Sequence, residues 1–280
     1  MLYMRIGGNR RMARKLYVIG NWKMYKTSRE ASAYIEALAP LVEGESACVY
    51  LAVPFTSIAS ASACAKETNI VIGAQNMNDA REGAFTGEIA GLMLKEAGAG
   101  FVLLGHSERR HIFGESNELI HKKILRAVRD DIQPVVCIGE TALQRKSDQT
   151  QKVIEEQLVS ALEAVPKEAL DSLMIAYEPV WAIGTGKVPT LHQIQEIHHF
   201  CRQCIAQILG ARKASKIPIL YGGSVKPENA ADIVALDDVD GLLAGGASLN
   251  VEAFSAIIRN ASKEKTPKKV RKTTIKRVKK

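Results

Sequence analysis

Three apolar stretches of the chain end in side chains that together could move a proton beside a carbonyl group. Glu178 follows the apolar run Leu173–Tyr177 and precedes Pro179, which biases it away from helical backbone angles. His106 and Lys23 follow apolar runs in the same way. A carboxylate can act as a general base, an imidazole can donate to a carbonyl oxygen, and an ammonium can stabilise developing negative charge. Each residue alone also fits a structural role, as a strand-end acid, a core histidine or a surface lysine.

His106 and Lys23 each have a neighbour that refines the expected chemistry. Ser107 follows His106, and a short helix can start there. Because the positive end of a helix disfavours a charged imidazole, we expect a neutral His106 that donates a hydrogen bond. Asn21 stands two residues before Lys23, whose ammonium would attract an anionic substrate.

The residues after Glu178 have the composition of a lid. Trp181 and Ile183 are set among Gly184 and Gly186, so the segment is apolar but interrupted by glycine. A loop of this kind can close over a ligand and exclude water. An ordinary turn after a strand is the alternative.

Two glycine pairs late in the chain point to a phosphate site. Gly222 and Gly223 precede Ser224, and Gly245 and Gly246 follow the next apolar run. Glycine lets backbone N–H groups approach an anion closely, and barrels often bind phosphate after their last two strands. Either pair alone would more often be a tight turn, but their occurrence after neighbouring strands favours a phosphate monoester.

Other known catalytic patterns are missing from the sequence. It contains no Ser-His-Asp order and no H-E-x-x-H zinc motif, and the glycines before Lys187 do not form a P-loop. We reject a metal site in one histidine- and cysteine-rich stretch, because it falls in a predicted helix where only residues three or four apart share a face. The residues of this stretch are His192, His198, His199, Cys201 and Cys204.

Short apolar runs alternate with amphipathic stretches, which predicts repeated βα units around a parallel sheet. The predicted strands are 16–20, 47–53, 70–74, 101–105, 134–138, 173–177, 217–221 and 241–244. The clearest helices are 28–42, 117–129, 153–164, 190–209 and 226–236. Eight units predict a single closed (β/α)₈ barrel with its active site at the carboxyl ends of the strands. An open, doubly wound sheet is the structural alternative.

The composition is that of a globular domain with basic ends. The 280 residues are 46% hydrophobic, and no apolar run reaches the roughly 18 residues that span a bilayer, so we expect a soluble protein without membrane attachment. The net charge of +8 is concentrated at the ends, because 262–280 carry ten basic residues and one acid and 1–14 carry four arginines. Residues 15–261 therefore have a net charge of −5. We expect a disordered extension over 1–15, with Met12 as an alternative start, a catalytic domain over 16–261 and a disordered basic tail over 262–280.

Five motifs in order resemble the triosephosphate isomerase family over about residues 16 to 259. The motifs are Asn21-Trp22-Lys23-Met24, Gly105 to Arg110, Ala176 to Lys187, Tyr221-Gly222-Gly223-Ser224 and Gly245 to Leu249. The resemblance implies a TIM barrel that interconverts dihydroxyacetone phosphate and D-glyceraldehyde 3-phosphate through an enediolate, without metal or organic cofactor. It also implies a cytoplasmic enzyme of glycolysis and gluconeogenesis.

The same resemblance implies roles for individual residues. Glu178 would move the proton, and His106 would donate to the substrate oxygens with help from Asn21 and Lys23. The phosphate would bind to backbone N–H groups of Gly184, Ser224, Gly245 and Gly246. Lid closure would press Ile183 and Leu243 around Glu178 and make it a stronger base, and the supporting residues would be Ser107 and Glu108.

The family is dimeric, and the resemblance extends to the contact between subunits. The polar loop from Gln75 to Gly87 would enter the neighbouring subunit and bring Thr86 near the partner's His106. Glu88 and Arg109 resemble an ion pair between the subunits.

The basic tail departs from the family and leaves a second function open. Its lysine and arginine clusters are typical of a solvated segment without a specific partner. They could also give weak, salt-sensitive binding to nucleic acid or another polyanion. The alternative function is therefore a barrel that also binds a polyanion through its tail.

Overall fold

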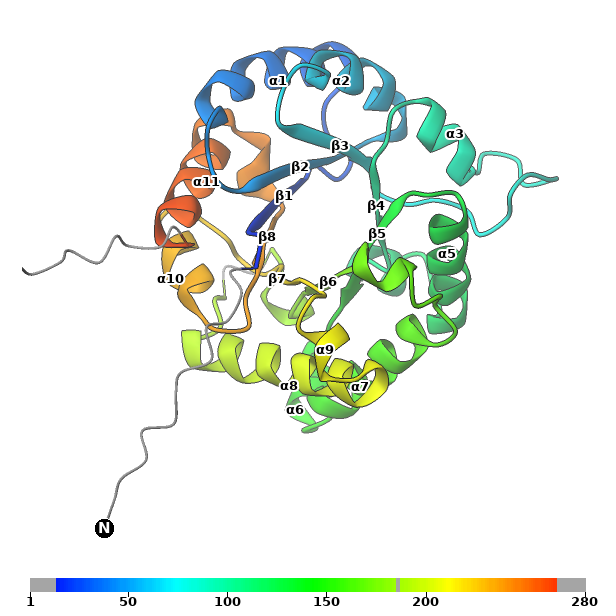
Figure 1. Ribbon diagram of the computed structural model, residues 1–280, viewed down its shortest axis with the longest axis vertical. Helices are drawn as coiled ribbons and strands as arrows, with labels where there is room; N and C mark the ends of the chain where they lie inside the picture. The colour runs from blue at the N-terminus through cyan, green and yellow to red at the C-terminus, as the bar shows by residue number, and fades with distance from the viewer. Residues whose placement is uncertain (1–13, 185–186, 266–280) are drawn as a thin grey trace, which may run out of the picture.

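The computed structural model describes residues 14–184 and 187–265, and their centre is a closed barrel of parallel strands (Figure 1). The strands are β1 (Tyr17–Asn21), β2 (Cys48–Val53), β3 (Ile70–Ala74), β4 (Phe101–Leu104), β5 (Gln133–Ile138), β6 (Met174–Tyr177), β7 (Ile219–Tyr221) and β8 (Gly241–Ala244). Each strand pairs with the next along the chain, and β8 pairs with β1, which excludes an open sheet. The prediction of a (β/α)₈ barrel is confirmed.

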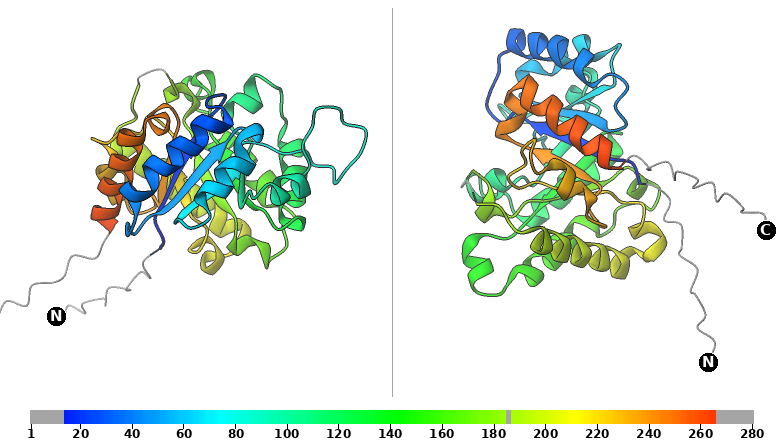
Figure 2. Two further views of the ribbon diagram at one scale, coloured as in Figure 1. Left: turned by 90° about the horizontal axis from the view of Figure 1, so that it is seen from above. Right: turned by 90° about the vertical axis from the view of Figure 1, so that its left-hand side faces the viewer.

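Helices form a ring around the strands (Figures 1 and 2). The α-helices are α1 (Ser28–Val42), α2 (Ile58–Ala65), α3 (Gly91–Glu96), α4 (Ser107–His111), α5 (Asn117–Arg129), α6 (Ala142–Lys146), α7 (Thr150–Leu162), α8 (Leu191–Leu209), α9 (Ala211–Ala214), α10 (Ala230–Ala235) and α11 (Val251–Lys265). Four 3₁₀ turns complete the described elements, η1 (Phe55–Ser57), η2 (Ala169–Asp171), η3 (Val180–Ala182) and η4 (Gly246–Leu249). None of the described helices is both long and apolar enough to cross a membrane.

The strands are mostly apolar, as expected of strands with both faces buried. Side chains that point inward fill the barrel, among them Ile19, Leu103 and Met174, while those that point outward pack against the helices. A Cβ atom added at Gly73 would lie 2.3 Å from the Phe101 ring, so glycine makes room for this ring inside the barrel.

Local signals set where the long helices begin. Thr27 and Glu30 form a capping box at the start of α1, and Thr190 and Gln193 form another at the start of α8. Each box satisfies backbone N–H groups that the first turn of a helix leaves without partners. The starts of α1 and α8 are therefore fixed, and with them the ends of the loops that follow β1 and β6.

The ends of the chain lie mostly outside the described residues. These ends are residues 1–13 of the predicted extension and 266–280 of the predicted tail. The three domain boundaries at 1–15, 16–261 and 262–280 stay predictions.

Candidate active site

Most of the predicted site residues line one cavity of about 400 Å³ at the carboxyl ends of the strands. The predicted residues in its lining are Asn21, Lys23, His106, Glu178, Ile183, Gly184, Ser224, Leu243, Gly245 and Gly246. They come from loops after β1, β4, β6, β7 and β8, together with the last residue of β1 and one residue of β8 itself. The closed barrel brings these distant segments to one place.

Glu178 is a buried residue in the lining of this cavity. Its backbone N–H donates to the carbonyl of Ile138 at 2.7 Å, which continues the pairing of β6 with β5. Only 3% of the residue is exposed, and its Oε1 lies 3.2 Å from Nε2 of His106. Its other oxygen, Oε2, has no hydrogen-bond partner within the described residues. A buried carboxylate oxygen without a partner is available to accept a proton from a ligand.

Two glycines hold Glu178 in position by allowing close contact. A Cβ atom at Gly139 would lie 1.8 Å from the carbonyl oxygen of Glu178, so the two backbones pack without room for a side chain. A Cβ atom at Gly222 would lie 2.7 Å from Cγ of Glu178. The backbone of Glu178 is therefore confined by the residue after β5, and its side chain by the residue after β7.

His106 caps helix α4, which begins at Ser107. Its Nδ1 accepts a hydrogen bond from the backbone N–H of Glu108 at 3.3 Å. Because Nδ1 accepts, the neutral ring carries its proton on Nε2, the nitrogen that faces Glu178. Burial lowers the pKa of His106, but the charge and hydrogen bond of Glu178, with the charge of Glu108, raise it by a larger amount. The pKa therefore lies above its ordinary value, which is opposite to the shift expected from the helix end alone.

Lys23 is fixed at the end of the first strand. Its φ angle of 54° lies in the left-handed region, and its Nζ is 2.5 Å from Oε1 of Glu108. The side-chain oxygen of Asn21 accepts from the Lys23 backbone N–H at 3.0 Å. On the other side, Nε2 of Gln75 donates to the Lys23 carbonyl at 2.9 Å. These contacts hold the ammonium group at the cavity.

The turns after β7 and β8 present backbone N–H groups to the other part of the cavity. The N–H groups of Gly245 and Gly246, and that of Gly184 in the loop after β6, have no hydrogen-bond acceptor within residues 14–184 and 187–265, whereas the Ser224 N–H donates to the Tyr221 hydroxyl group. The Ser248 N–H and Oγ both donate to the carbonyl of Gly245, at 2.8 and 2.7 Å. The carbonyl is therefore occupied, while the N–H groups of Gly245 and Gly246 stay free to bind an anion.

The loop after Glu178 is anchored by an acid that the sequence analysis missed. Glu140 is fully buried and accepts from Trp181 Nε1 at 2.8 Å, from Tyr177 OH at 3.1 Å and from Arg145 Nη1 at 3.0 Å. Arg145 also stacks over the Trp181 ring at 4.6 Å. The sequence held a signal for Glu140, because it stands two residues after β5, where functional side chains of a barrel are expected. Residues 185 and 186 of the predicted lid lie outside the described residues.

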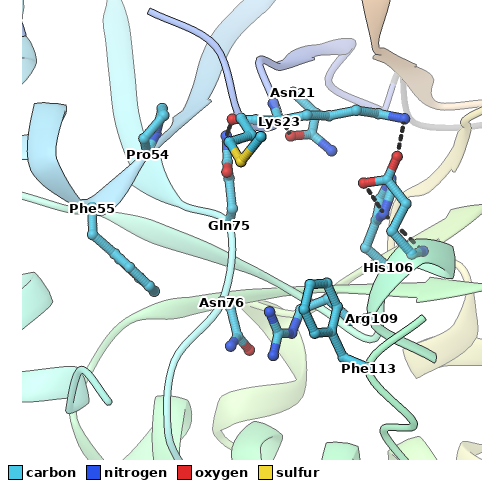
Figure 3. Close-up of a pocket in the computed structure, with 11 residues that line it drawn as sticks. Asn21, Lys23, Pro54, Phe55, Gln75, Asn76, His106, Arg109 and Phe113 are labelled. Atoms are coloured by element: carbon cyan, nitrogen blue, oxygen red, sulfur yellow. Dashed lines mark hydrogen bonds and ion pairs between the residues drawn. The ribbon is translucent and has the colours of Figure 1, made fainter. Parts of the chain in front are cut away.

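A second cavity of about 260 Å³ adjoins the first and shares Asn21, Lys23 and His106 with it. Figure 3 shows Phe55 on one wall and Arg109 with Phe113 on the opposite wall. Phe113 is 65% exposed. The wall of the second cavity is therefore partly apolar and open to solvent.

The predicted dimer residues lie near this second cavity or on a projecting loop. The loop between β3 and α3 stands out from the barrel in two views (Figures 1 and 2), and Thr86 and Glu88 on it are exposed. Within the single chain, Glu88 accepts from Asn78 at 2.8 Å, and Arg109 pairs with Glu115 at 2.5 Å.

The histidines and cysteines of the 192–204 stretch lie on α8, away from both cavities. His192 and His199 contact the carboxylates of Glu196 and Asp238, at 3.2 and 3.0 Å. Burial lowers the pKa of His198 to about 4, so this core imidazole is neutral at pH 7. These contacts give each exposed histidine a local partner.

Comparison with known proteins places the whole barrel in one family. Residues 16–261 match the family model described as "Triosephosphate isomerase". The chain is 51% identical over 247 residues to a triosephosphate isomerase of Protochlamydia amoebophila, covering 88% of this chain and 94% of that protein. It is 45% identical to that of Carboxydothermus hydrogenoformans, covering 89% and 99%. The crystal structure of the Bartonella henselae triosephosphate isomerase superposes with a TM-score of 0.81 at 35% identity, covering 88% and 98%.

Proposed function

The chain belongs to the triosephosphate isomerase family, and we propose that Glu178, His106, Lys23 and Asn21 carry out its reaction. It is an aldose–ketose isomerase that interconverts dihydroxyacetone phosphate and D-glyceraldehyde 3-phosphate. One observation carries the assignment of roles. A buried carboxylate lies 3.2 Å from an imidazole N–H in a cavity that also presents free backbone N–H groups.

Glu178 is the base in this proposal. Its carboxylate takes a proton from the carbon next to the carbonyl, and the electron pair of the broken C–H bond forms a C=C bond. The carbonyl oxygen takes up the displaced electron pair, which gives an enediolate. A proton then passes from the hydroxyl oxygen to the former carbonyl oxygen, and return of the first proton to the neighbouring carbon gives the other isomer, so no atom is gained or lost. The unpartnered Oε2 supports this role, since it needs no bond to break before it accepts.

His106 and Lys23 stabilise the negative oxygen. The Nε2–H of His106 points toward Glu178, so a substrate carbon within reach of the carboxylate holds its oxygens within reach of this donor. A bound substrate must displace part of the His106–Glu178 contact. Lys23 adds positive charge beside the oxygens, and Glu108 holds its ammonium at 2.5 Å. Asn21 fixes the Lys23 backbone.

The phosphate group binds at the opposite part of the cavity. The N–H groups of Gly184, Ser224, Gly245 and Gly246 are suited to phosphate oxygens, because an anion satisfies several such donors together, and those of Gly184, Gly245 and Gly246 have no other acceptor within the described residues. Ile183 and Leu243 line the space around Glu178. Closure of the segment from Pro179 to Lys187 would exclude water from the enediolate.

The enzyme forms a homodimer in which each projecting loop enters the second cavity of the partner subunit. That cavity adjoins the active site and has partly apolar walls, which favours an occupant of mixed polarity (Figure 3). Exposed apolar side chains support the same interface, with Met24, Phe85 and Phe113 between 53% and 93% exposed. Thr86 reaches the partner's site, and Glu88 pairs with Arg109 across the interface.

Two further sequence-based predictions belong to this proposal, and one alternative does not. The enzyme acts in the cytoplasm, and all five cysteines are unpaired, as expected in a reducing compartment. It works in glycolysis and gluconeogenesis. A polyanion-binding function of the basic tail is not advanced, because no comparison favours it and 266–280 lie outside the described residues.

A coupled assay of D-glyceraldehyde 3-phosphate isomerisation tests the proposal. Glu178→Gln keeps the shape of the side chain but removes the base, so kcat should fall about a hundredfold or more. Glu196→Gln changes an exposed acid on α8 and should retain wild-type activity. Equal activity of wild type and Glu178→Gln would contradict the assignment of the base.

A further inference from the structure

Two aromatic residues from the start of the barrel hold the turn that follows its last strand. The Nε1–H of Trp22 and the hydroxyl group of Tyr34 both donate to the carbonyl oxygen of Ser248, at 3.2 and 2.6 Å. All three residues are buried. Trp22 directly follows β1, Tyr34 lies in α1, and Ser248 lies in η4. This contact therefore joins the segments that follow the first and the last strand on the side of the active site.

The two rings support each other. Their centroids are 4.9 Å apart at an interplanar angle of 72°, an edge-to-face arrangement. Nζ of Lys26 lies 4.7 Å from the centroid of Tyr34 and 5.4 Å from that of Trp22. Burial raises the pKa of Tyr34, so its hydroxyl group stays protonated and remains a donor. The rings and the ammonium together fix the two donors that meet at one oxygen.

Ser248 links these donors to the cavity. Its carbonyl accepts from the aromatic pair, while its own N–H and Oγ–H donate to the carbonyl of Gly245. Gly245 and Gly246 then present their free N–H groups to the cavity. A chain of hydrogen bonds thus runs from Tyr34 through Ser248 to Gly245.

We propose that Tyr34 is a positioning residue for the phosphate group of the substrate, acting through Ser248 on the N–H groups of Gly245 and Gly246. The proposal rests on the assignment of these N–H groups to phosphate. Fixing the turn before binding means that less conformational freedom is lost when the anion arrives. Trp22 holds the same oxygen from the segment that carries Lys23, so the aromatic pair also ties the phosphate turn to the catalytic lysine.

The variant Tyr34→Phe tests this inference, because it removes one hydroxyl group and keeps the ring. Loss of one buried hydrogen bond should raise the inhibition constant of inorganic phosphate and the KM for D-glyceraldehyde 3-phosphate by about three- to tenfold. The kcat should change less than the KM. D-glyceraldehyde lacks the phosphate group, so its slow isomerisation should be the same in Tyr34→Phe and in wild type.

Tyr50→Phe is a matched control at the other end of the barrel. The Tyr50 hydroxyl group donates to Gln133, the first residue of β5, at 3.1 Å. This variant loses the same group, and neither cavity contains Tyr50. It should therefore leave the inhibition constant of phosphate unchanged. Thermal unfolding of both variants shows how much of any effect is a general loss of stability.

The outcomes separate this inference from the proposed function. If phosphate inhibits wild type and Tyr34→Phe equally, the positioning role is wrong. The same holds if Tyr34→Phe loses activity equally on D-glyceraldehyde and its phosphate ester, because that pattern indicates general damage. If phosphate does not inhibit wild type competitively, the assignment of the phosphate site itself fails, and the positioning role fails with it.

Discussion

Gly222→Ala tests how closely the position of Glu178 controls catalysis. Gly222 does not have a positive φ angle, so alanine can adopt its backbone conformation. The backbone N–H of Gly222 donates a hydrogen bond to the carbonyl of Tyr177 at 2.8 Å, and a side chain at this position leaves that hydrogen bond intact. The new methyl group, however, would lie 2.7 Å from Cγ of Glu178. The substitution therefore perturbs the carboxylate and little else.

The expected loss follows from the displacement. Ordinary contact begins at 3.4 Å, so the Glu178 side chain must move by about 0.7 Å. A displacement near 1 Å can cost about a hundredfold in rate when a catalytic group must meet its substrate closely. We expect kcat to fall by about ten- to a hundredfold, or about 1.4 to 2.7 kcal/mol in the barrier. The KM should stay within about twofold of wild type, because the substitution leaves the proposed phosphate contacts in place.

Steady-state kinetics and denaturant unfolding of the purified variant measure the two effects separately. Gly100→Ala is the control. Gly100 lies just before the start of β4 and does not line the cavity, and its new methyl group would lie 3.1 Å from Cγ1 of Val71. It imposes a tight contact without touching Glu178. It should lower stability slightly and leave kcat unchanged.

Wild-type kcat in Gly222→Ala would refute the claim that the glycine positions the base. A loss of kcat that parallels the loss of folded protein, with the same loss in Gly100→Ala, would refute it too. In that case crowding in the barrel, and not the carboxylate, would explain the effect.

Three further predictions concern the charges and the surface around the site. The pKa of His106 is raised because Glu178 outweighs burial, so the folded chain binds this proton more tightly than the unfolded chain. This contribution to stability is fully present below the ordinary histidine pKa and is lost as pH rises through the raised value. Glu178→Gln should therefore lower the His106 pKa, measured by NMR titration of the ring, and an unchanged pKa would contradict the cause assigned here. Glu140→Gln should lower the free energy of unfolding by about 1 to 3 kcal/mol, because an amide cannot accept from all the donors around it. Denaturant titration tests this, and wild-type stability would count against the anchoring role. Phe113→Asp should weaken the dimer about tenfold or more in sedimentation experiments, whereas Leu143→Asp, a control on exposed α6, should not. Equal association of both variants would argue against the proposed interface.

The fold could be predicted because its strands are easy to recognise in the sequence. Each buried strand is a short apolar run, and each long helix has an amphipathic pattern, so the order of eight units was visible without coordinates. The strand-end rule also selected Glu178 and His106, which the structure places 3.2 Å apart although 72 positions separate them in the chain. Their roles stay predictions.

Contacts between distant segments could not be predicted. Glu140 follows β5, as expected of a functional residue at the end of a strand. Its donors, however, lie on β6 (Tyr177), in the loop after β6 (Trp181) and on α6 (Arg145). Tyr34 has the spacing of an ordinary buried helix residue, and nothing in the sequence indicates that its hydroxyl group reaches Ser248. Likewise, the closeness of Gly222 to Glu178 depends on the spacing of β6 and β7, which the barrel alone determines.

The central claim is that Glu178 carries a proton between two neighbouring carbons. It is tested most directly by isomerisation in D₂O, with NMR detection of deuterium bound to carbon in substrate and product. The account predicts that wild type introduces deuterium at the reacting carbons as it turns over. Glu178→Gln should lose turnover and deuterium uptake together, by about a hundredfold or more. Turnover by wild type without any deuterium uptake, or undiminished uptake by Glu178→Gln, would contradict the claim.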